Sequence, residues 1–239
     1  SSIRRNHALI TPDTHVERTP VGWQDAATIV HISPELGARF TQYTAVMQRG
    51  GASAMPGEGI QRAIFVTEGD VELETRGSQT LGAGNFAYLP PNVEHTIRAT
   101  CVTRLVVFEK SYQPLEGVSL PEVVVGHERD VPSEPFQGDP DARLQTLLPV
   151  DPAFDMAINV FTYQPGATLP QVEVHVMEHG LVMLAGAGVY RLGDSWYPVE
   201  AGDVIWMASY CPQWFVAMGK TPAQYLYYKD IHRDRITDK

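Results

Sequence analysis

The second half of the sequence repeats a pattern found in the first half, and this repeat limits the possible folds more than any other feature. The stretch 81–90 (LGAGNFAYLP) matches 199–208 (VEAGDVIWMA), because both run through a glycine and a polar residue into an apolar segment. Upstream of these stretches, Gly69 has a counterpart at Gly186. We therefore expect two similar structural units that arose by duplication.

The apolar runs in both halves have the length and composition of β-strands. They are short, rich in Val, Ile, Tyr and Phe, and separated by turn residues such as Gly-Asp and Pro-Gly. The clearest runs lie at 40–47, 63–66, 102–108, 158–163, 181–184, 204–207 and 225–228. Many short strands at this spacing are typical of a sandwich or barrel. Only 141–148 shows helical periodicity, so the sequence predicts an all-β fold.

A proline-rich stretch separates the two halves. Seven prolines and several acidic residues occur between positions 113 and 155. This composition suits an extended connector on the surface better than a core strand. The expected organisation is an N-terminal barrel over 1–116, a connector over 117–153 and a C-terminal barrel over 154–239.

The segment from Gly166 to Gly186 contains residues with metal-binding chemistry. Glu173 and His175 are two residues apart, so on a strand both side chains point to one face, and His179 has the same parity. A carboxylate and two imidazoles on one face are good ligands for a divalent first-row metal. The alternative interpretation is a solvated polar face with structural histidines.

The spacing of this segment resembles the first of the two sequence motifs of the cupin family. Six residues separate Gly166 from Glu173, one separates Glu173 from His175, three separate His175 from His179, and six separate His179 from Gly186. Glu173 then occupies the usual first-histidine position, and His179 occupies the usual glutamate position. The resemblance implies a bicupin, with two tandem cupin-type barrels of the double-stranded β-helix or jelly-roll type.

The second cupin motif is present in a modified form. Ala208 stands at the usual proline position, Tyr210 at the usual turn glycine, and Gln213 at the usual histidine. A glutamine can still coordinate a hard or borderline ion through its amide oxygen. The candidate metal ligands are therefore Glu173, His175, His179 and Gln213.

The first half does not retain such a ligand set. The same alignment places the ligand positions of its first motif on Pro56, Glu58 and Arg62. A proline side chain cannot coordinate, and the permanent cation of an arginine repels a metal. We expect the N-terminal barrel to have lost its metal and to serve as scaffold or interface, with His95 as a hydrogen-bonded barrel histidine rather than a ligand.

Composition and charge argue against several classes of function. The net charge of −10 repels phosphate backbones, so nucleic-acid binding is not expected. No run approaches the roughly 20 apolar residues of a membrane-spanning helix, and the N-terminal residues lack the apolar core of a signal peptide. We therefore expect a cytoplasmic protein without a membrane partner. Cys101 and Cys211 match no disulfide framework or zinc motif, and both are expected to be small buried hydrophobes.

Motifs along the chain from about 8 to 233 resemble the (S)-ureidoglycine aminohydrolase family. They are LITPD at 9–13, GEGI at 57–60, FDM at 154–156, EHG at 178–180, GVY at 188–190, PQW at 212–214 and YLYYKD at 225–230. Members of this family are bicupins of purine and allantoin catabolism that convert (S)-ureidoglycine to (S)-ureidoglycolate and ammonia. The resemblance implies a hydrolase that acts on a small ureido amino acid.

The resemblance also implies a role for each candidate residue. Manganese is the expected metal, held by Glu173, His175, His179 and Gln213. The expected substrate contacts come from Tyr225, Lys229, Glu173 and Gln213. The expected catalytic residues are Lys229 and Tyr190.

Two of these assignments have alternatives, and the resemblance adds one expectation about assembly. Lys229 would either carry a proton, since burial near a cation lowers the pKa of an amine, or hold the substrate carboxylate. For Tyr190 the alternative is barrel packing. A homodimer or larger homo-oligomer is expected from the resemblance only.

Two other functions are compatible with the sequence. One is another cupin metalloenzyme, such as an iron dioxygenase acting on a small acid, although Gln213 in place of a third histidine argues against it. The other is a non-enzymatic bicupin binding protein, although an intact ligand set together with Tyr225 and Lys229 argues against that. Ammonia release from ureidoglycine, compared with oxygen consumption, separates these possibilities.

Overall fold

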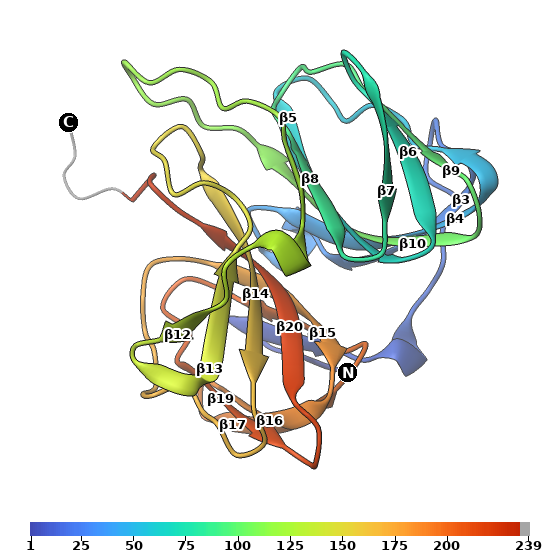
Figure 1. The fold of residues 1–239 in the computed structure, drawn as a ribbon. Helices are drawn as coiled ribbons and strands as arrows, with labels where there is room; N and C mark the ends of the chain where they lie inside the picture. Colours follow the sequence, from blue (N-terminus) through green and yellow to red (C-terminus); the bar gives the residue numbers. More distant parts are fainter. Residues whose placement is uncertain (235–239) are drawn as a thin grey trace. The chain divides into compact units, whose positions relative to one another are not determined.

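The computed structural model describes residues 1–234, which form an almost entirely β structure (Figure 1). The described residues contain twenty strands and three 3-10 helices, each helix three residues long. The all-β prediction is confirmed. No helix within residues 1–234 has the length and apolar character that a membrane crossing requires.

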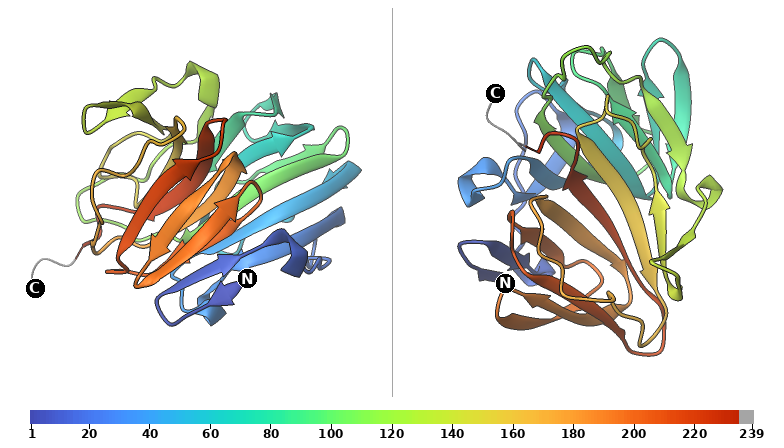
Figure 2. Two further views of the ribbon diagram at one scale, coloured as in Figure 1. Left: turned by 90° about the horizontal axis from the view of Figure 1, so that it is seen from below. Right: turned by 90° about the vertical axis from the view of Figure 1, so that its left-hand side faces the viewer.

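The chain divides into two compact units. Unit 1 combines Ser1–His15 with the chain from Val131 onward, and unit 2 is Val16–Asp130. Figure 2 shows the curled sheets of the two units from two further directions. Each unit has its own buried apolar core inside its sheets.

Unit 2 is built around one curled sheet. Its strands follow the order β11-β8-β5-β10-β4-β9-β6-β7, and β3 pairs with β4 outside this path. The bounds are β3 Gln24–Ile32, β4 Thr41–Ala52, β5 Ile60–Glu68, β6 Asp70–Glu74, β7 Ser78–Gly82, β8 Asn85–Leu89, β9 Thr96–Ala99, β10 Thr103–Ser111 and β11 Val124–His127. The 3-10 helices of this unit are η2 Pro34–Leu36 and η3 Glu128–Asp130.

Unit 1 contains an eight-stranded sheet and a three-stranded sheet. The first has the order β1-β2-β18-β15-β20-β14-β13-β12, and the second has the order β17-β16-β19. The bounds are β1 Ser2–Ile3, β2 His7–Ile10, η1 Pro12–Thr14, β12 Glu134–Phe136, β13 Asp139–Thr146, β14 Met156–Tyr163, β15 His179–Ala185, β16 Ala187–Leu192, β17 Ser195–Glu200, β18 Val204–Met207, β19 Gln213–Met218 and β20 Ala223–Asp230.

The strand orders explain the sequence repeat. The run β8-β5-β10-β4 of unit 2 has the same order as β18-β15-β20-β14 of unit 1. Glycine is needed at both paired positions for the same reason, because the backbone is left-handed there, with φ +74° at Gly69 and +70° at Gly186. At each position a Cβ would lie 2.4 Å from a backbone carbonyl oxygen, of Val102 and Pro222 respectively. Both hairpins therefore require glycine.

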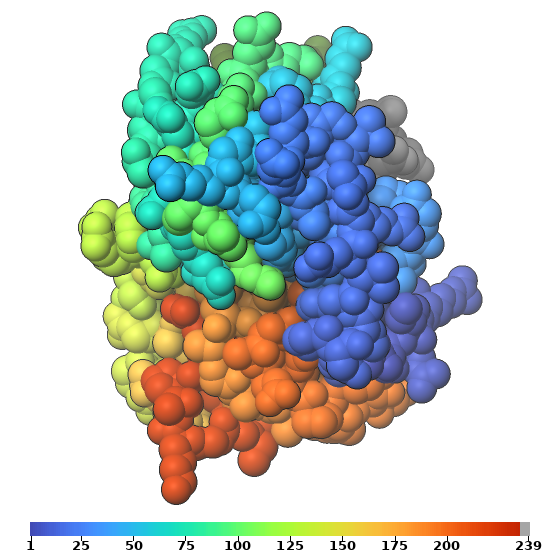
Figure 3. All heavy atoms as spheres, turned by 90° about the vertical axis from the view of Figure 1, so that its right-hand side faces the viewer, coloured from blue at the N-terminus to red at the C-terminus, as the bar shows by residue number. Residues whose placement is uncertain are grey.

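The division of the chain differs from the expected bounds of 1–116, 117–153 and 154–239. The N-terminal strand β2 belongs to unit 1, because it pairs antiparallel with β18, with Ala8 opposite Trp206. Figure 3 shows the dark blue N-terminal residues next to the orange surface of this part of the chain. A pairing between segments almost 200 residues apart leaves no local signal in the sequence.

The proline-rich connector also contains strands. β11 extends the sheet of unit 2 by pairing with β8, and β13 extends that of unit 1 by pairing with β14. Pro135 is tolerated because β12 is an edge strand, which needs fewer backbone donors. Residues 141–148 do not form a helix, since 139–146 is strand β13, with Ala142 and Leu144 packed on the core.

The two cysteines are both free but differ in burial. Cys211 is buried, as expected, whereas Cys101 is only partly buried and lies beside Asp70 and Thr103 in a surface turn. The expectation that both are buried is therefore correct for Cys211 alone.

Candidate active site

The interior of unit 1 holds a cavity of about 150 Å³. Every residue that the sequence marks as a candidate lines it: Glu173, His175, Tyr190, His179, Gln213, Tyr225 and Lys229. Apolar side chains complete the lining, among them Phe136, Leu144, Phe161 and Leu169. The cavity thus combines metal-type donors, an amine and hydroxyl groups with apolar side chains.

Strands β15 and β20 place the deeper polar groups by their alternation. Tyr225, Tyr227 and Lys229 are two residues apart on β20, so all three side chains face the interior. Within the antiparallel pair, His179 lies opposite Lys229, and Leu181 lies opposite Tyr227. The imidazole and the amine are therefore neighbours because of strand register.

The segment before β15 is not a continuous strand. Glu173 forms an isolated bridge with Gln213, in which N–H of Glu173 donates to the Gln213 carbonyl at 2.8 Å and N–H of Gln213 donates back at 3.0 Å. The Tyr210 N–H donates to the His175 carbonyl at 2.7 Å. These bonds tie the segment to the start of β19 and bring Glu173, His175 and Gln213 to the same cavity.

The orientation of His175 is set by its own backbone surroundings. Its Nδ1 lies 3.2 Å from the Met177 carbonyl oxygen, so Nδ1–H donates there and Nε2 accepts from the side-chain amide of Gln213. Nε2 lies 2.8 Å from the Gln213 side-chain nitrogen and 3.8 Å from Glu173 Oε2. Rotation of the Gln213 amide by 180° would present its oxygen at the same place.

His179 carries the clearest indication of a missing partner. Its side chain is 9% exposed, and its Nε2 is buried without a hydrogen-bond partner among the described residues. Burial holds the pKa of His179 well below its usual range, and the nearby His175 and Lys229 act in the same direction. A neutral imidazole with an unshared buried nitrogen has the form that a metal ligand requires.

The residue types in the cavity suit a divalent ion, but their side chains are not arranged around one point as metal ligands. Within residues 1–234, no group of three His, Cys, Asp or Glu side chains has the geometry of a metal site. Two other observations support a metal at this site. The Nε2 of His179 is buried without a hydrogen-bond partner among the described residues, and Gln213 adds an amide oxygen, a donor that is not among these four residue types. An unpaired buried polar atom costs about 1–3 kcal/mol, which coordination would remove.

Lys229 is half-buried next to these groups. Burial lowers its pKa, and the carboxylates of Glu173 and Asp230 oppose this effect. The amine therefore lies where it can either carry a proton or hold an anion.

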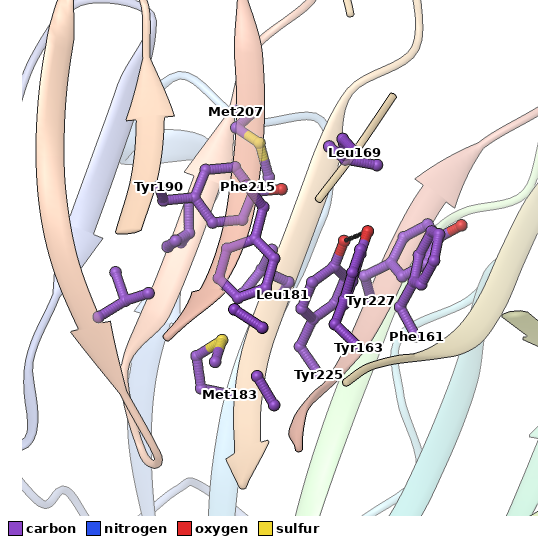
Figure 4. Close-up of a cluster of buried hydrophobic side chains, with 14 of the residues drawn as sticks. Phe161, Tyr163, Leu169, Leu181, Met183, Tyr190, Met207, Phe215, Tyr225 and Tyr227 are labelled. Atoms are coloured by element: carbon purple, nitrogen blue, oxygen red, sulfur yellow. Dashed lines mark hydrogen bonds between the residues drawn. The ribbon is translucent and has the colours of Figure 1, made fainter. Parts of the chain in front are cut away.

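Tyr163, Tyr190, Tyr225 and Tyr227 lie close together in the core of unit 1 (Figure 4), and all but Tyr163 line the cavity. The hydroxyl oxygens of Tyr163 and Tyr225 are 3.1 Å apart, and burial raises the pKa of Tyr225 well above its usual range. Tyr227 stacks on the imidazole of His179, with ring centroids 5.6 Å apart and planes 8° apart. Burial also raises the pKa of Tyr190. All four hydroxyls are therefore protonated at neutral pH.

Sequence reasoning did not single out Tyr163 or Tyr227. Tyr227 could have been found by parity, because it lies two residues from both Tyr225 and Lys229 on one strand. Tyr163 could not, because only the register of β14 against β20 brings it to Tyr225.

The corresponding position of unit 2 holds an ion pair. Arg62 is 2% exposed, and its Nε donates to Glu109 Oε1 at 2.6 Å. Its Nη1 donates to the Ala54 carbonyl at 3.0 Å and to His95 Nε2 at 3.1 Å. His95 Nδ1 lies 2.8 Å from the Val93 carbonyl, so its Nδ1–H donates there and Nε2 accepts from Arg62.

The chain is similar in sequence and in structure to several known proteins. The family model described as Cupin domain matches residues 159–228. A probable (S)-ureidoglycine aminohydrolase of Oryza sativa subsp. japonica is 44% identical, over 98% of this chain and 76% of that protein. The (S)-ureidoglycine aminohydrolase of Arabidopsis thaliana is 42% identical, over 98% and 78%. The crystal structure of a putative glyoxylate-induced protein from Pseudomonas aeruginosa superposes with a TM-score of 0.90 at 31% identity, over 100% and 93%.

Proposed function

The chain belongs to the (S)-ureidoglycine aminohydrolase family, and on this premise we propose that it is a metal-dependent hydrolase that converts (S)-ureidoglycine and water to (S)-ureidoglycolate and ammonia. In this reaction a C–N bond to the amine breaks and a C–O bond to water forms on the carbon that bears the ureido group and the carboxylate. The identity to relatives named for this activity, over almost the whole chain, supports the assignment.

The observation that carries the proposal is the shared cavity. Metal-type donors and the Tyr225 and Lys229 side chains line the same space of about 150 Å³. Pockets for drug-sized ligands are about 300–1,000 Å³, so this one suits a much smaller molecule. A compact ureido amino acid matches both the size and the mixture of charged and hydrogen-bonding groups.

The proposed metal is manganese, held by Glu173, His175, His179 and Gln213. Two oxygen donors and two imidazoles suit a hard or borderline divalent ion. The Nε2 of His179, which has no hydrogen-bond partner among residues 1–234, supports this assignment. When bound, such an ion would supply Lewis acidity and orient the substrate.

The protein groups around the ligand set have separate proposed roles. Lys229 is half-buried opposite His179, where it either holds the substrate carboxylate or transfers a proton to the leaving amine. Tyr225 and Tyr190 offer protonated hydroxyls as hydrogen-bond donors. Glu173 and Gln213 also face the substrate. Apolar side chains of the lining, such as Phe136 and Leu144, limit the access of bulk water to these contacts.

We also propose, on family membership alone, a cytoplasmic homo-oligomer whose partner in the reaction is a small molecule. The net charge of −10 is unfavourable for nucleic-acid binding.

The decisive experiment measures products and metal together. Purified protein is analysed for metal, stripped with a chelator and reconstituted with Mn²⁺, and each form is assayed for ammonia release from freshly prepared ureidoglycine. We expect equal amounts of ammonia and ureidoglycolate from the reconstituted form, and neither from the stripped form. Oxygen consumption with small acids and no ammonia would instead support a dioxygenase, and binding without turnover would support a binding protein.

A further inference from the structure

The hydroxyl of Tyr163 contacts the cavity only through Tyr225. Tyr163 is 0% exposed at the end of β14, and its oxygen lies 3.1 Å from the oxygen of Tyr225 (Figure 4). Tyr225 lines the cavity, whereas Tyr163 does not. Tyr163 therefore lies behind Tyr225 as seen from the cavity.

The ring of Tyr163 is fixed on two sides. It stacks on Phe161 with ring centroids 4.5 Å apart and planes at 17°. The ring of Phe215 meets it edge-on at 5.0 Å. Because a Phe at position 163 would make the same ring contacts, packing alone does not account for a buried hydroxyl, whose burial is costly without a partner.

The hydrogen bond between Tyr163 and Tyr225 has a preferred direction. Within residues 1–234, Tyr225 is the hydrogen-bond partner found for Tyr163. If Tyr225 donated, the Tyr163 proton would be left unsatisfied in the core, and an orphaned buried donor is costlier than an unused lone pair. Tyr163 therefore donates its proton to the oxygen of Tyr225. The proton of Tyr225 then points away from Tyr163, toward the side where the Tyr190 hydroxyl and the cavity lie.

We propose that Tyr163 is a positioning residue that makes Tyr225 a hydrogen-bond donor to an acceptor oxygen of the substrate, either a carboxylate or a ureido carbonyl. This inference rests on the proposed function, since it concerns a contact of the same site. The bond from Tyr163 also polarises the Tyr225 O–H group, which strengthens its donation to the ligand. Without Tyr163, the hydroxyl of Tyr225 could turn and accept from Tyr190 or present a lone pair to the cavity, which repels an anionic oxygen.

The kinetic experiment is a double-mutant cycle with Tyr163→Phe and Tyr225→Phe. We expect Tyr163→Phe to lower kcat/KM by about 2- to 12-fold, the effect of one buried hydrogen bond, with unchanged metal content. In the Tyr225→Phe background the same change is expected to have almost no further effect, because its target is gone. Equal losses in both backgrounds, or no loss in either, would overturn the proposal.

A matched control removes a buried hydroxyl from unit 2. Tyr43 donates to Glu109 at 3.0 Å, so Tyr43→Phe also loses one buried hydrogen bond. We expect this variant to retain wild-type kcat/KM. An equal loss of activity in the control would mean that Tyr163→Phe acts through general stability, and the positioning role would be rejected.

Neutron diffraction of the wild-type protein tests the direction of the bond without any activity measurement. The expected result is a deuterium atom covalently attached to the Tyr163 oxygen and pointing at Tyr225. A deuterium on Tyr225 pointing at Tyr163 would overturn the inference. Absence of ammonia release by wild-type protein would overturn the proposed function instead, so the two failures are distinguishable.

Discussion

Arg62 donates a hydrogen bond of 3.1 Å to Nε2 of His95, so a side-chain cation meets the ring nitrogen that a cupin metal would otherwise use. Strand register makes the two units comparable, because Arg62 lies opposite Glu109 on β10 just as His179 lies opposite Lys229 on β20. Unit 2 therefore has a cation on the ligand strand and an anion opposite, whereas unit 1 has a neutral ligand and a basic residue. This difference explains why we propose a metal for unit 1 only.

Removing one partner of the buried ion pair between Arg62 and Glu109 is expected to destabilise unit 2 strongly. Glu109→Gln leaves the guanidinium of Arg62, which is 2% exposed, without its counter-charge. Breaking such a pair costs about 3–5 kcal/mol, and the partial exposure of Glu109 places the expected loss at about 3 kcal/mol. Chemical unfolding measures this loss, and metal content should not change.

The matched control is a surface pair in the same unit. Arg104 and Glu68 are 3.8 Å apart, and both side chains are exposed. Glu68→Gln should change the free energy of unfolding by less than about 1 kcal/mol. Equal effects of the two variants would mean that the Arg62–Glu109 pair contributes no more than a surface contact.

His95 is expected to make the stability of unit 2 sensitive to acid. Burial lowers the pKa of His95 in the folded state, and the Arg62 cation acts in the same direction. In the unfolded state His95 has a pKa near 6.5, so below this pH the unfolded state binds a proton more readily than the folded state does. The stabilisation is complete above about pH 6.5 and is lost as the pH falls below that value.

His95→Gln provides the comparison for this pH effect. Glutamine retains an oxygen that accepts from Arg62 but does not titrate. The free energy of unfolding of the variant should fall less than that of the wild type between about pH 7.5 and pH 5. Parallel pH curves for the two proteins would show that other groups cause the acid sensitivity.

Local spacing groups the candidate residues that line one cavity, but it does not reveal which segments pair over long sequence separations. Glu173, His175 and His179 are close in sequence, and a motif of fixed spacing is enough to group them with Gln213. The pairing of β2 with β18, and the contact of Tyr163 with Tyr225, depend instead on long-range register. The helical periodicity of 141–148 does not correspond to a helix, because a half-buried strand with a few intermediate positions resembles a short helix in sequence.

Loss of either proposed histidine ligand should remove the metal and the activity together. His175→Ala and His179→Ala each take one nitrogen donor from the cavity, so bound Mn²⁺ and ammonia release are expected to fall to background. His95→Gln, in the other unit, should retain wild-type metal content, since its Nε2 is already hydrogen-bonded to Arg62. Elemental analysis after dialysis measures this directly. Loss of metal from the His95 variant would place the site in unit 2.

Substitution of Lys229 should separate substrate binding from chemistry. Lys229→Met keeps a similar length and apolar bulk while removing the charge and the proton. Because the proposed ligands lie on other residues, the variant should keep its fold and its metal. Lys220→Met, which changes an exposed lysine in the turn before β20, is the control and should behave like the wild type.

The kinetic constants of Lys229→Met then decide between the two roles of the amine. If Lys229 transfers a proton to the leaving amine, kcat should fall by about 100-fold or more, with a smaller change in KM. If it holds the substrate carboxylate, the loss should appear mainly as a higher KM. Unchanged kcat and KM would place Lys229 outside the reacting groups, although it is half-buried beside the proposed ligands. That outcome would also weaken the assignment of this reaction to the cavity.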